Sequence, residues 1–261
     1  MLHRHTPDGL LLITQPAHAW ISGQLARAWG NEQFPAFAPY EDVCLAAEQH
    51  DLAWLDWEQA PALNPATRLP YTFMDLPVPA HTALWQTAGP RALLQGSRYA
   101  ALLISLHGSG LYQRREIEKD PPADRAAIQN ALAVMNAFEG QQLETLRRDP
   151  FYAPYATVER IDENRALIAC FDYLSLLLCM GVQKERLAEL SFPRGKIAFT
   201  LSPVNGDINA IRLKPWPFSA RELTVCCDVR RLNGTFVTQE HLDLALQDAS
   251  REALRIRLSA G

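Results

Sequence analysis

Residues 157–180, TVERIDENRALIACFDYLSLLLCM, are the stretch that decides the fold. Charged residues fill the first half and apolar residues the second, which predicts one long helix whose C-terminal half is buried. Asp172 stands inside the apolar half, with no Lys or Arg within one helical turn. A buried, isolated carboxylate costs several kcal/mol unless it is paired or binds a metal. Its partner must therefore come from another segment.

The chain before this stretch is also predicted to be mostly helical. Pro16 suits the first turn of a helix, and Glu41 and Asp42 suit the first turn of another. We expect Gly89-Pro90 to interrupt one helix, and Gly108 with Gly110 to end the next. The predicted helices cover residues 17–29, 40–51, 80–94, 99–107 and 124–148, with a proline-rich loop over 61–79.

The sequence pattern changes after Ser191. Short apolar runs over 197–201, 208–213 and 223–229 are separated by Pro, Gly and Asn, which predicts strands joined by turns. Residues 239–258 are expected to form a final amphipathic helix, and residues 10–14 a short strand or lead-in. The predicted fold is therefore mainly α, with a helical body over 1–190 and a small α+β elaboration over 191–261 packed on it.

Composition limits the classes of function. The chain has 261 residues, 48% of them hydrophobic, and a net charge of −4, which suits one large globular domain. No basic run predicts a nucleic-acid or membrane-surface contact. The longest apolar stretch, 166–180, is too short to span a bilayer. We therefore expect a small-molecule substrate, with no nucleic-acid or membrane partner.

The cysteines indicate the redox environment. Five are present, an odd number, and no pair has Cys-x-x-Cys spacing. A disulfide framework or a zinc–thiolate site is not expected, and a reducing compartment fits this usage. Residues 1–12 lack the charged-then-apolar layout of a signal peptide. The predicted location is the cytoplasm.

Four of the seven histidines lie on predicted helices among apolar residues: His18, His50, His81 and His107. An unpaired polar group is costly in such a place. Adjacent side chains on a helix diverge by about 100°. His50 and Asp51 can therefore bind at one site only if that site spans the angle between their two directions. A metal pair bridged by the carboxylate is such a site.

Four imidazoles with two carboxylates make a nitrogen and oxygen ligand set. Such a set favours iron, manganese, zinc or cobalt over magnesium or calcium. One histidine, the His-Asp pair and a distal Asp would hold one ion, and two further histidines a second, with Asp51 bridging. The expected cofactor is two divalent transition-metal ions, iron or manganese. The predicted ligands are His18, His50, Asp51, His81, His107 and Asp172.

This order of ligands resembles the His-Asp (HD) domain superfamily in its dinuclear form, over roughly residues 10–180. That resemblance implies one ligand on each successive helix of a five-helix core. A narrower resemblance is to a bacterial family of unknown function. The segments that carry it are TQPAHAWISGQLA (14–26), HDLAW (50–54), SLH (105–107) and KPWPF (214–218).

The sequence departs from the superfamily at one position. Many HD hydrolases carry Lys three residues after the Asp, where it contacts substrate phosphate, whereas this chain has Trp54. An indole offers one N–H donor and no charge, so a more apolar pocket is expected. Residues considered for the pocket or for contacts behind the ligands are Ser22, Gln49, Trp54 and Arg98, with Arg27 as a further base at the pocket mouth.

Each ligand also has an interpretation without metal. A helical His among apolar residues is often a hydrogen-bonded core residue, and His50 or His107 could cap a helix end. His81 could lie on the surface at a helix start. Asp172 could form an ion pair between helices.

Three functions follow from the ligand set. The first is an HD-type hydrolase that acts on a small phosphorylated molecule through a dinuclear metal centre. The second is a mixed-valent diiron oxygenase of the same superfamily, which the aromatic surroundings favour. The third is a metal-bound scaffold or sensor without catalysis. The sequence assigns no catalytic residue beyond the ligands.

Overall fold

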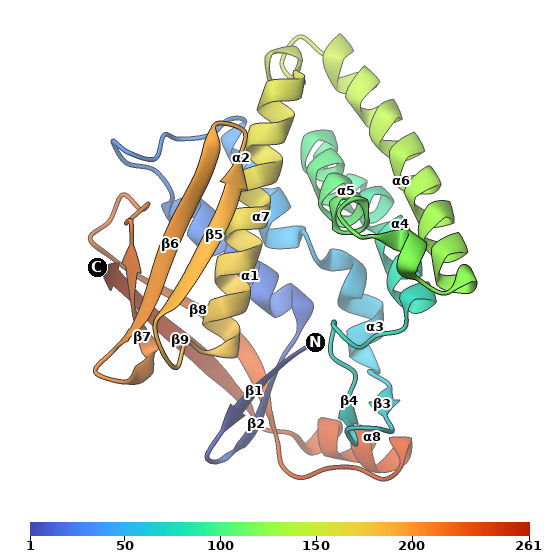
Figure 1. The fold of residues 1–261 in the computed structure, drawn as a ribbon, viewed down its shortest axis with the longest axis vertical. Helices are drawn as coiled ribbons and strands as arrows, with labels where there is room; N and C mark the ends of the chain where they lie inside the picture. Colours follow the sequence, from blue (N-terminus) through green and yellow to red (C-terminus); the bar gives the residue numbers. More distant parts are fainter.

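The computed structural model describes residues 1–261, which form a curled sheet covered on one side by helices (Figure 1). The strands lie in the order β1-β2-β8-β9-β7-β6-β5, and only β7 and β9 run parallel. The first and last strands of the chain thus belong to the same sheet. Its strands are β1 (Leu2–Thr6), β2 (Gly9–Ile13), β5 (Arg186–Phe192), β6 (Gly195–Val204), β7 (Asp207–Lys214), β8 (Glu222–Leu232) and β9 (Arg251–Ala260).

The helices form successive layers away from the sheet. Helices α1 and α7 contact strands, α2 and α5 pack behind them, and α4 and α6 lie outermost (Figure 1). None of these helices combines the length and apolar character that a membrane span requires. The helices are α1 (Gln15–Ala28), α2 (Tyr40–Gln49), α3 (Leu55–Gln59), α4 (Val78–Leu93), α5 (Arg98–Gln113), α6 (Pro122–Arg148), α7 (Val158–Met180) and α8 (Gln239–Asp248). Short 3₁₀ turns occur at Leu52–Trp54, Ile117–Lys119 and Ala153–Tyr155, and β3 (Leu63–Asn64) pairs with β4 (Leu69–Pro70).

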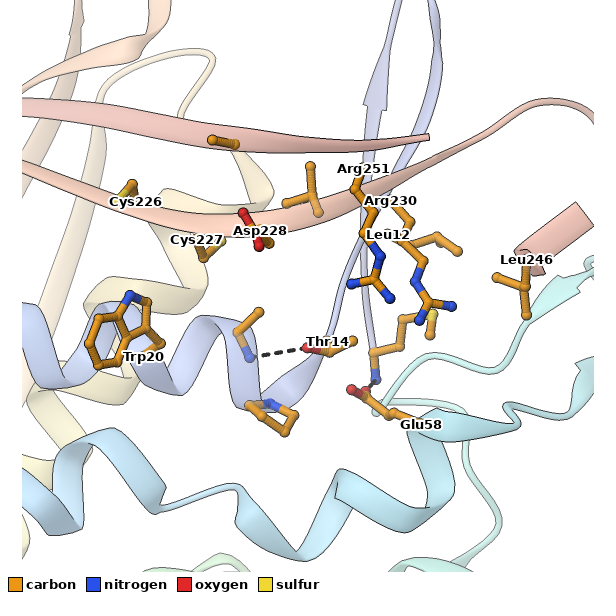
Figure 2. A pocket seen from close by; sticks show the side chains of 15 residues that line it. Leu12, Thr14, Trp20, Glu58, Cys226, Cys227, Asp228, Arg230, Leu246 and Arg251 are labelled. Carbon is orange, nitrogen blue, oxygen red and sulfur yellow. Dashed lines mark hydrogen bonds and ion pairs between the residues drawn. The ribbon is translucent and has the colours of Figure 1, made fainter. Parts of the chain in front are cut away.

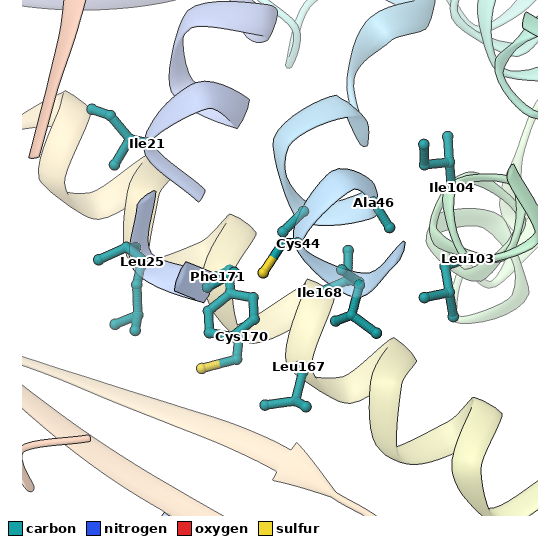
Figure 3. Packing of buried hydrophobic residues seen from close by; sticks show 14 of the residues in the cluster. Ile21, Leu25, Cys44, Ala46, Leu103, Ile104, Leu167, Ile168, Cys170 and Phe171 are labelled. Carbon is teal, nitrogen blue, oxygen red and sulfur yellow. The ribbon is translucent and has the colours of Figure 1, made fainter. Parts of the chain in front are cut away.

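Local sequence explains where the main helices start. Thr14 caps α1 by accepting a hydrogen bond from the Ala17 N–H, and Thr157 caps α7 in the same way. Between α1, α2, α5 and α7 lies a dense apolar core, where Leu25, Cys44 and Phe171 are fully buried (Figure 3). This core fixes the four helical segments that carry the candidate site.

The expectation of a mainly α protein is wrong, because a seven-stranded sheet makes this an α/β fold. The largest error concerns residues 239–258, where α8 ends at Asp248 and β9 follows. Leu254, Ile256 and Leu258 are buried at every second position of β9, the period of a strand. The expected boundary near residue 190 falls inside β5, and β1 and β2 belong to the same sheet as the C-terminal strands.

Two helices continue through glycines that were expected to break them. Helix α5 runs through Gly108 to Gln113. The glycine lets Trp85 of α4 pack closely, since an added Cβ would lie 2.4 Å from its ring. Helix α4 likewise continues through Gly89-Pro90, where a Cβ on Gly89 would lie 2.4 Å from the Phe138 ring. These glycines serve close helix packing and do not end the helices.

Candidate metal centre

Five of the six expected ligands converge between the helices. They fall into two overlapping groups, His18 with His50 and Asp51, and His50 with His107 and Asp172. In each group the candidate ligand atoms lie within 4.8 Å of one another. His18 comes from α1, His50 and Asp51 from the end of α2, His107 from α5 and Asp172 from α7. We call these five residues the His–Asp cluster.

The distances in the His–Asp cluster join imidazole nitrogens to carboxylate oxygens. His18 Nε2 lies 2.6 Å from Asp51 Oδ2 and 3.8 Å from Asp172 Oδ1. His50 Nε2 lies 3.5 Å and 3.4 Å from the same two carboxylates. His107 Nε2 lies 3.8 Å from Asp172 Oδ2. Both carboxylates therefore face several imidazoles at once.

The end of α2 explains how two adjacent residues serve one site. Helix α2 ends at Gln49, and His50 keeps helical backbone angles. Asp51 leaves the helix with φ −102° and ψ 18°, ahead of the 3₁₀ turn. After this change of direction, His50 Nε2 lies 3.5 Å from the Asp51 carboxylate and 3.4 Å from that of Asp172.

Hydrogen bonds behind the rings fix the tautomers of two histidines. His50 Nδ1 lies 2.8 Å from the Ala47 carbonyl, which only accepts, so this nitrogen carries the proton. Ser175 Oγ donates to the Asp172 carbonyl at 2.8 Å and therefore accepts from His18 Nδ1 at 2.7 Å. Each ring thus directs Nε2 at the carboxylates, the arrangement that metal-bound histidines adopt.

This geometry requires positive charge between the rings and the carboxylates. In the neutral rings, Nε2 presents a lone pair to carboxylate oxygens that also only accept. His50 Nε2 is buried without any hydrogen-bond partner. A proton or a metal ion must occupy such a position, and the nitrogen and oxygen donor set suits a transition metal. The residues present therefore fit a metal ion.

The pKa values show the same need for positive charge. Burial opposes the charged form of His50, but Asp51 and Asp172 outweigh it and raise its pKa to about 9. Burial also acts to raise the pKa of Asp172, yet His50 and the other imidazoles hold it well below its usual range. At His107 burial dominates and lowers the pKa to about 4, so this ring is neutral near pH 7.

His81 lies outside both groups of the His–Asp cluster. Its Nε2 accepts a hydrogen bond from Trp85 Nε1 at 3.2 Å, so its Nδ1 carries the proton and donates to the Tyr112 hydroxyl. Burial lowers the pKa of His81 to about 4, which keeps the ring neutral. With both nitrogens engaged, His81 has no lone pair to offer a metal in this arrangement.

The other residues considered for the pocket have different surroundings. Ser22 donates to Ser175 Oγ at 2.9 Å, behind His18. Trp54 is fully buried, and its ring centroid lies 5.4 Å from that of His81. Gln49 is half-buried beside Glu48, while Arg27 and Arg98 form ion pairs with Glu48 and Asp149.

Ser175 is the supporting residue that sequence reasoning missed. It lies one helical turn after Asp172 on α7 and is fully buried. The signal in the sequence was a small polar residue three positions after the buried Asp, on the same helix face.

The His–Asp cluster is partly open to solvent, at Asp172 and His107. The His18 and His50 side chains are 0% exposed, whereas those of Asp172 and His107 are 17% and 8% exposed. A cavity of about 190 Å³ between α5 and α7 is lined by His107, and Arg114 and Arg165 line it too. Sites that act on a substrate keep such an open side, whereas structural metal sites are closed.

The fold and the cluster together define an α/β protein with a buried histidine and aspartate centre shared among four helical segments. The chain belongs to the family described as "Protein of unknown function (DUF3891)", whose model matches residues 1–234. Comparison with curated proteins and with solved structures gave no match.

Proposed function

We propose that this protein is a metal-dependent hydrolase of the HD type, acting on a small phosphorylated molecule. His18, His50, Asp51 and Asp172 would hold a divalent transition-metal ion, with His107 at the open side. The observation that carries the proposal is the pair of buried Nε2 atoms directed at two carboxylates. The placement of the ligands on α1, the end of α2, α5 and α7 supports the relationship to HD domains.

The cavity beside His107 supports a phosphorylated substrate. Trp54 supplies no charge, and Arg27 and Arg98 are engaged at the surface. Arg114 and Arg165 line the cavity with His107, and Asp162, which lies 3.6 Å from Arg165, lines it too. A guanidinium can donate two parallel hydrogen bonds to phosphate oxygens. These two arginines would hold the substrate phosphate, the role that a lysine has in many HD hydrolases.

The bound metal ion and the protein side chains would contribute in different ways. A bound divalent ion would supply Lewis acidity toward phosphate and lower the pKa of water. The chain's own residues orient and shield the site: Ser175 and the Ala47 carbonyl hold two imidazoles, and the His18 and His50 side chains are 0% exposed. Arg114 and Arg165 bind and orient the anionic substrate.

The diiron oxygenase remains the second candidate. The aromatic surroundings favour it, because the Trp85 ring lies 5.6 Å from that of His107 and Trp54 is fully buried. A second iron would require His81 to give up its bonds to Trp85 and Tyr112. The five-residue cluster therefore favours the hydrolase with at least one ion.

The Arg165→Gln variant tests the substrate class. We expect its kcat/KM for small phosphate esters, with manganese or ferrous iron, to fall by about tenfold or more, because a charged hydrogen bond contributes roughly 1.5–3 kcal/mol. Metal content should not change. Arg160→Gln, on the same helix but paired with Glu163 at the surface, is the matched control. Equal turnover in both variants, or oxygen consumption by the iron-loaded protein without ester hydrolysis, would contradict the hydrolase proposal.

Removing the support behind His18 should weaken metal binding without removing a ligand. In Ser175→Ala the His18 Nδ1 proton loses its acceptor, and the ring is free to rotate. Loss of such a partner typically costs 10–100-fold in metal affinity, roughly, and we expect a loss in that range. Competition with a fluorescent chelator measures it. Ser109→Ala on α5, also buried, is the control, and equal affinities of the two variants would refute the role of Ser175.

A further inference from the structure

A second cavity lies apart from the His–Asp cluster. It has a volume of about 450 Å³ and is bordered by β2, the start of α1, α3, β8, β9 and α8 (Figure 2). None of the five cluster residues lines it. Its size is typical of small-molecule sites.

Two arginines from neighbouring strands face this cavity. Arg230 of β8 pairs with Arg251 of β9 and also with Leu12 of β2. Residues directly opposite each other in a sheet project on the same side, and Figure 2 shows both guanidinium groups extending into the cavity. Like charges directly opposite each other are destabilising, so this pair destabilises the sheet unless an anion lies between the two guanidinium groups.

Neither of these two guanidinium groups forms an ion pair or a side-chain hydrogen bond in the structure. By contrast, the next residue on β8, Arg231, pairs with Glu252 at 2.7 Å. Two acidic residues also line the cavity. Glu58 is already engaged, since it accepts the Gln15 N–H at 2.8 Å and lies 2.6 Å from the Met1 amino group. Asp228 is exposed and makes no ion pair.

The opposite end of the cavity is aromatic. Trp20 lies there, 45% exposed, with the arginines at the other end (Figure 2). Leu12, Val229 and Leu246 supply apolar walls. Flat aromatic groups stack on an exposed indole, as nucleobases do. The cavity thus offers an anion site and an aromatic platform within one volume.

We propose that this cavity binds a small aromatic phosphate, of the nucleoside monophosphate class, with its phosphate between Arg230 and Arg251 and its base toward Trp20. A phosphate suits the pair better than a carboxylate, because it presents more oxygens and more charge to two guanidinium forks. The site is independent of the proposed hydrolase activity.

Calorimetric titration of the 261-residue chain with adenosine monophosphate tests this site. We expect saturable binding that weakens by about tenfold or more in Arg230→Gln/Arg251→Gln, because two charged hydrogen-bond donors are lost. The control Arg255→Gln, on β9 but outside the cavity, should bind like the wild type. Trp20→Leu should weaken the nucleotide but not inorganic phosphate, and adenosine alone should bind more weakly than its phosphate.

The background variant Asp172→Asn separates this site from the metal centre. Adenosine monophosphate should still bind to it, in the presence of a chelator. The proposal would be overturned by no saturable binding of any of these probes to the wild type, by unchanged binding in the double arginine variant, or by loss of binding in Asp172→Asn. Tighter binding of indole-3-acetate than of the nucleotide would also overturn it, because the arginine pair would then prefer a carboxylate to a phosphate. Thermal unfolding verifies that the double variant is folded.

Discussion

The Asp51→Asn variant is expected to lose its bound metal. The Asp51 carboxylate lies 2.6 Å from His18 Nε2 and 3.5 Å from His50 Nε2, so it contacts both buried rings. Asparagine keeps the shape but removes the negative charge that a cation between these groups requires. The loss should exceed the roughly 10–100-fold expected when only a group behind a ligand is removed. Elemental analysis of the purified protein should give an occupancy near zero.

Two comparison variants sharpen this measurement. Asp56→Asn makes the same change nearby at a side chain that is 65% exposed, and it should keep full metal content. His81→Phe should also keep the metal held by the cluster, because His81 is bonded to Trp85 and Tyr112. Full metal content in Asp51→Asn would contradict the assignment. A halved content in His81→Phe would instead restore the dinuclear expectation.

The metal-free protein should be most stable near pH 6.5. The folded pKa of His50 is raised from 6.5 to about 9. The stability from its charged form is therefore fully present below pH 6.5 and is lost as pH rises through about 9. The loss amounts to at most about 3 kcal/mol, at 1.36 kcal/mol per pKa unit.

Below pH 6.5 the stability of the folded protein changes with pH in the opposite direction. The folded pKa of His107 is lowered to about 4, so between pH 6.5 and 4 the unfolded chain binds the proton and the folded chain does not. Stability therefore falls as pH drops through this window. Asp51 and Asp172, whose pKa values are depressed, add further losses only at lower pH.

Urea unfolding of chelator-treated protein between pH 5 and 9 measures this profile. His50→Gln should lose the alkaline decline while keeping the acid one. Metal-loaded wild type should also lack the alkaline decline, because a bound ion needs the deprotonated Nε2 and competes better as pH rises. Metal-free stability that is constant or rises from pH 7 to 9 would contradict the arrangement of charges around His50.

Most of the candidate site could be predicted from sequence, because its polar side chains stand among apolar residues on predicted helices. Asp172 had no charge partner on its own helix, and His50-Asp51 had to face one point across a helix end. His81 shows the limit of such reasoning. Its ring is satisfied by Trp85, four residues along the same helix, and by Tyr112 on α5, a contact that depends on how two helices pack.

The fold was harder to predict than the site. The sheet joins β2 to β8 and β7 to β9, pairings between segments distant in sequence that no local pattern specifies. The β9 segment alternates Arg with Leu and Ile, a strand pattern that was overlooked because the helical pattern of α8 leads directly into it. The long helices α6 and α7 were correctly located, since their periodic patterns extend over many turns.

Anomalous diffraction from crystals of the manganese- or cobalt-loaded protein tests the central claim most directly. The account predicts a peak between the His18, His50, Asp51 and Asp172 side chains, with metal–ligand distances of roughly 2.0–2.3 Å, and no such peak in Asp51→Asn. A protein that takes up no metal, or a peak elsewhere with His50 Nε2 still unligated, would contradict it.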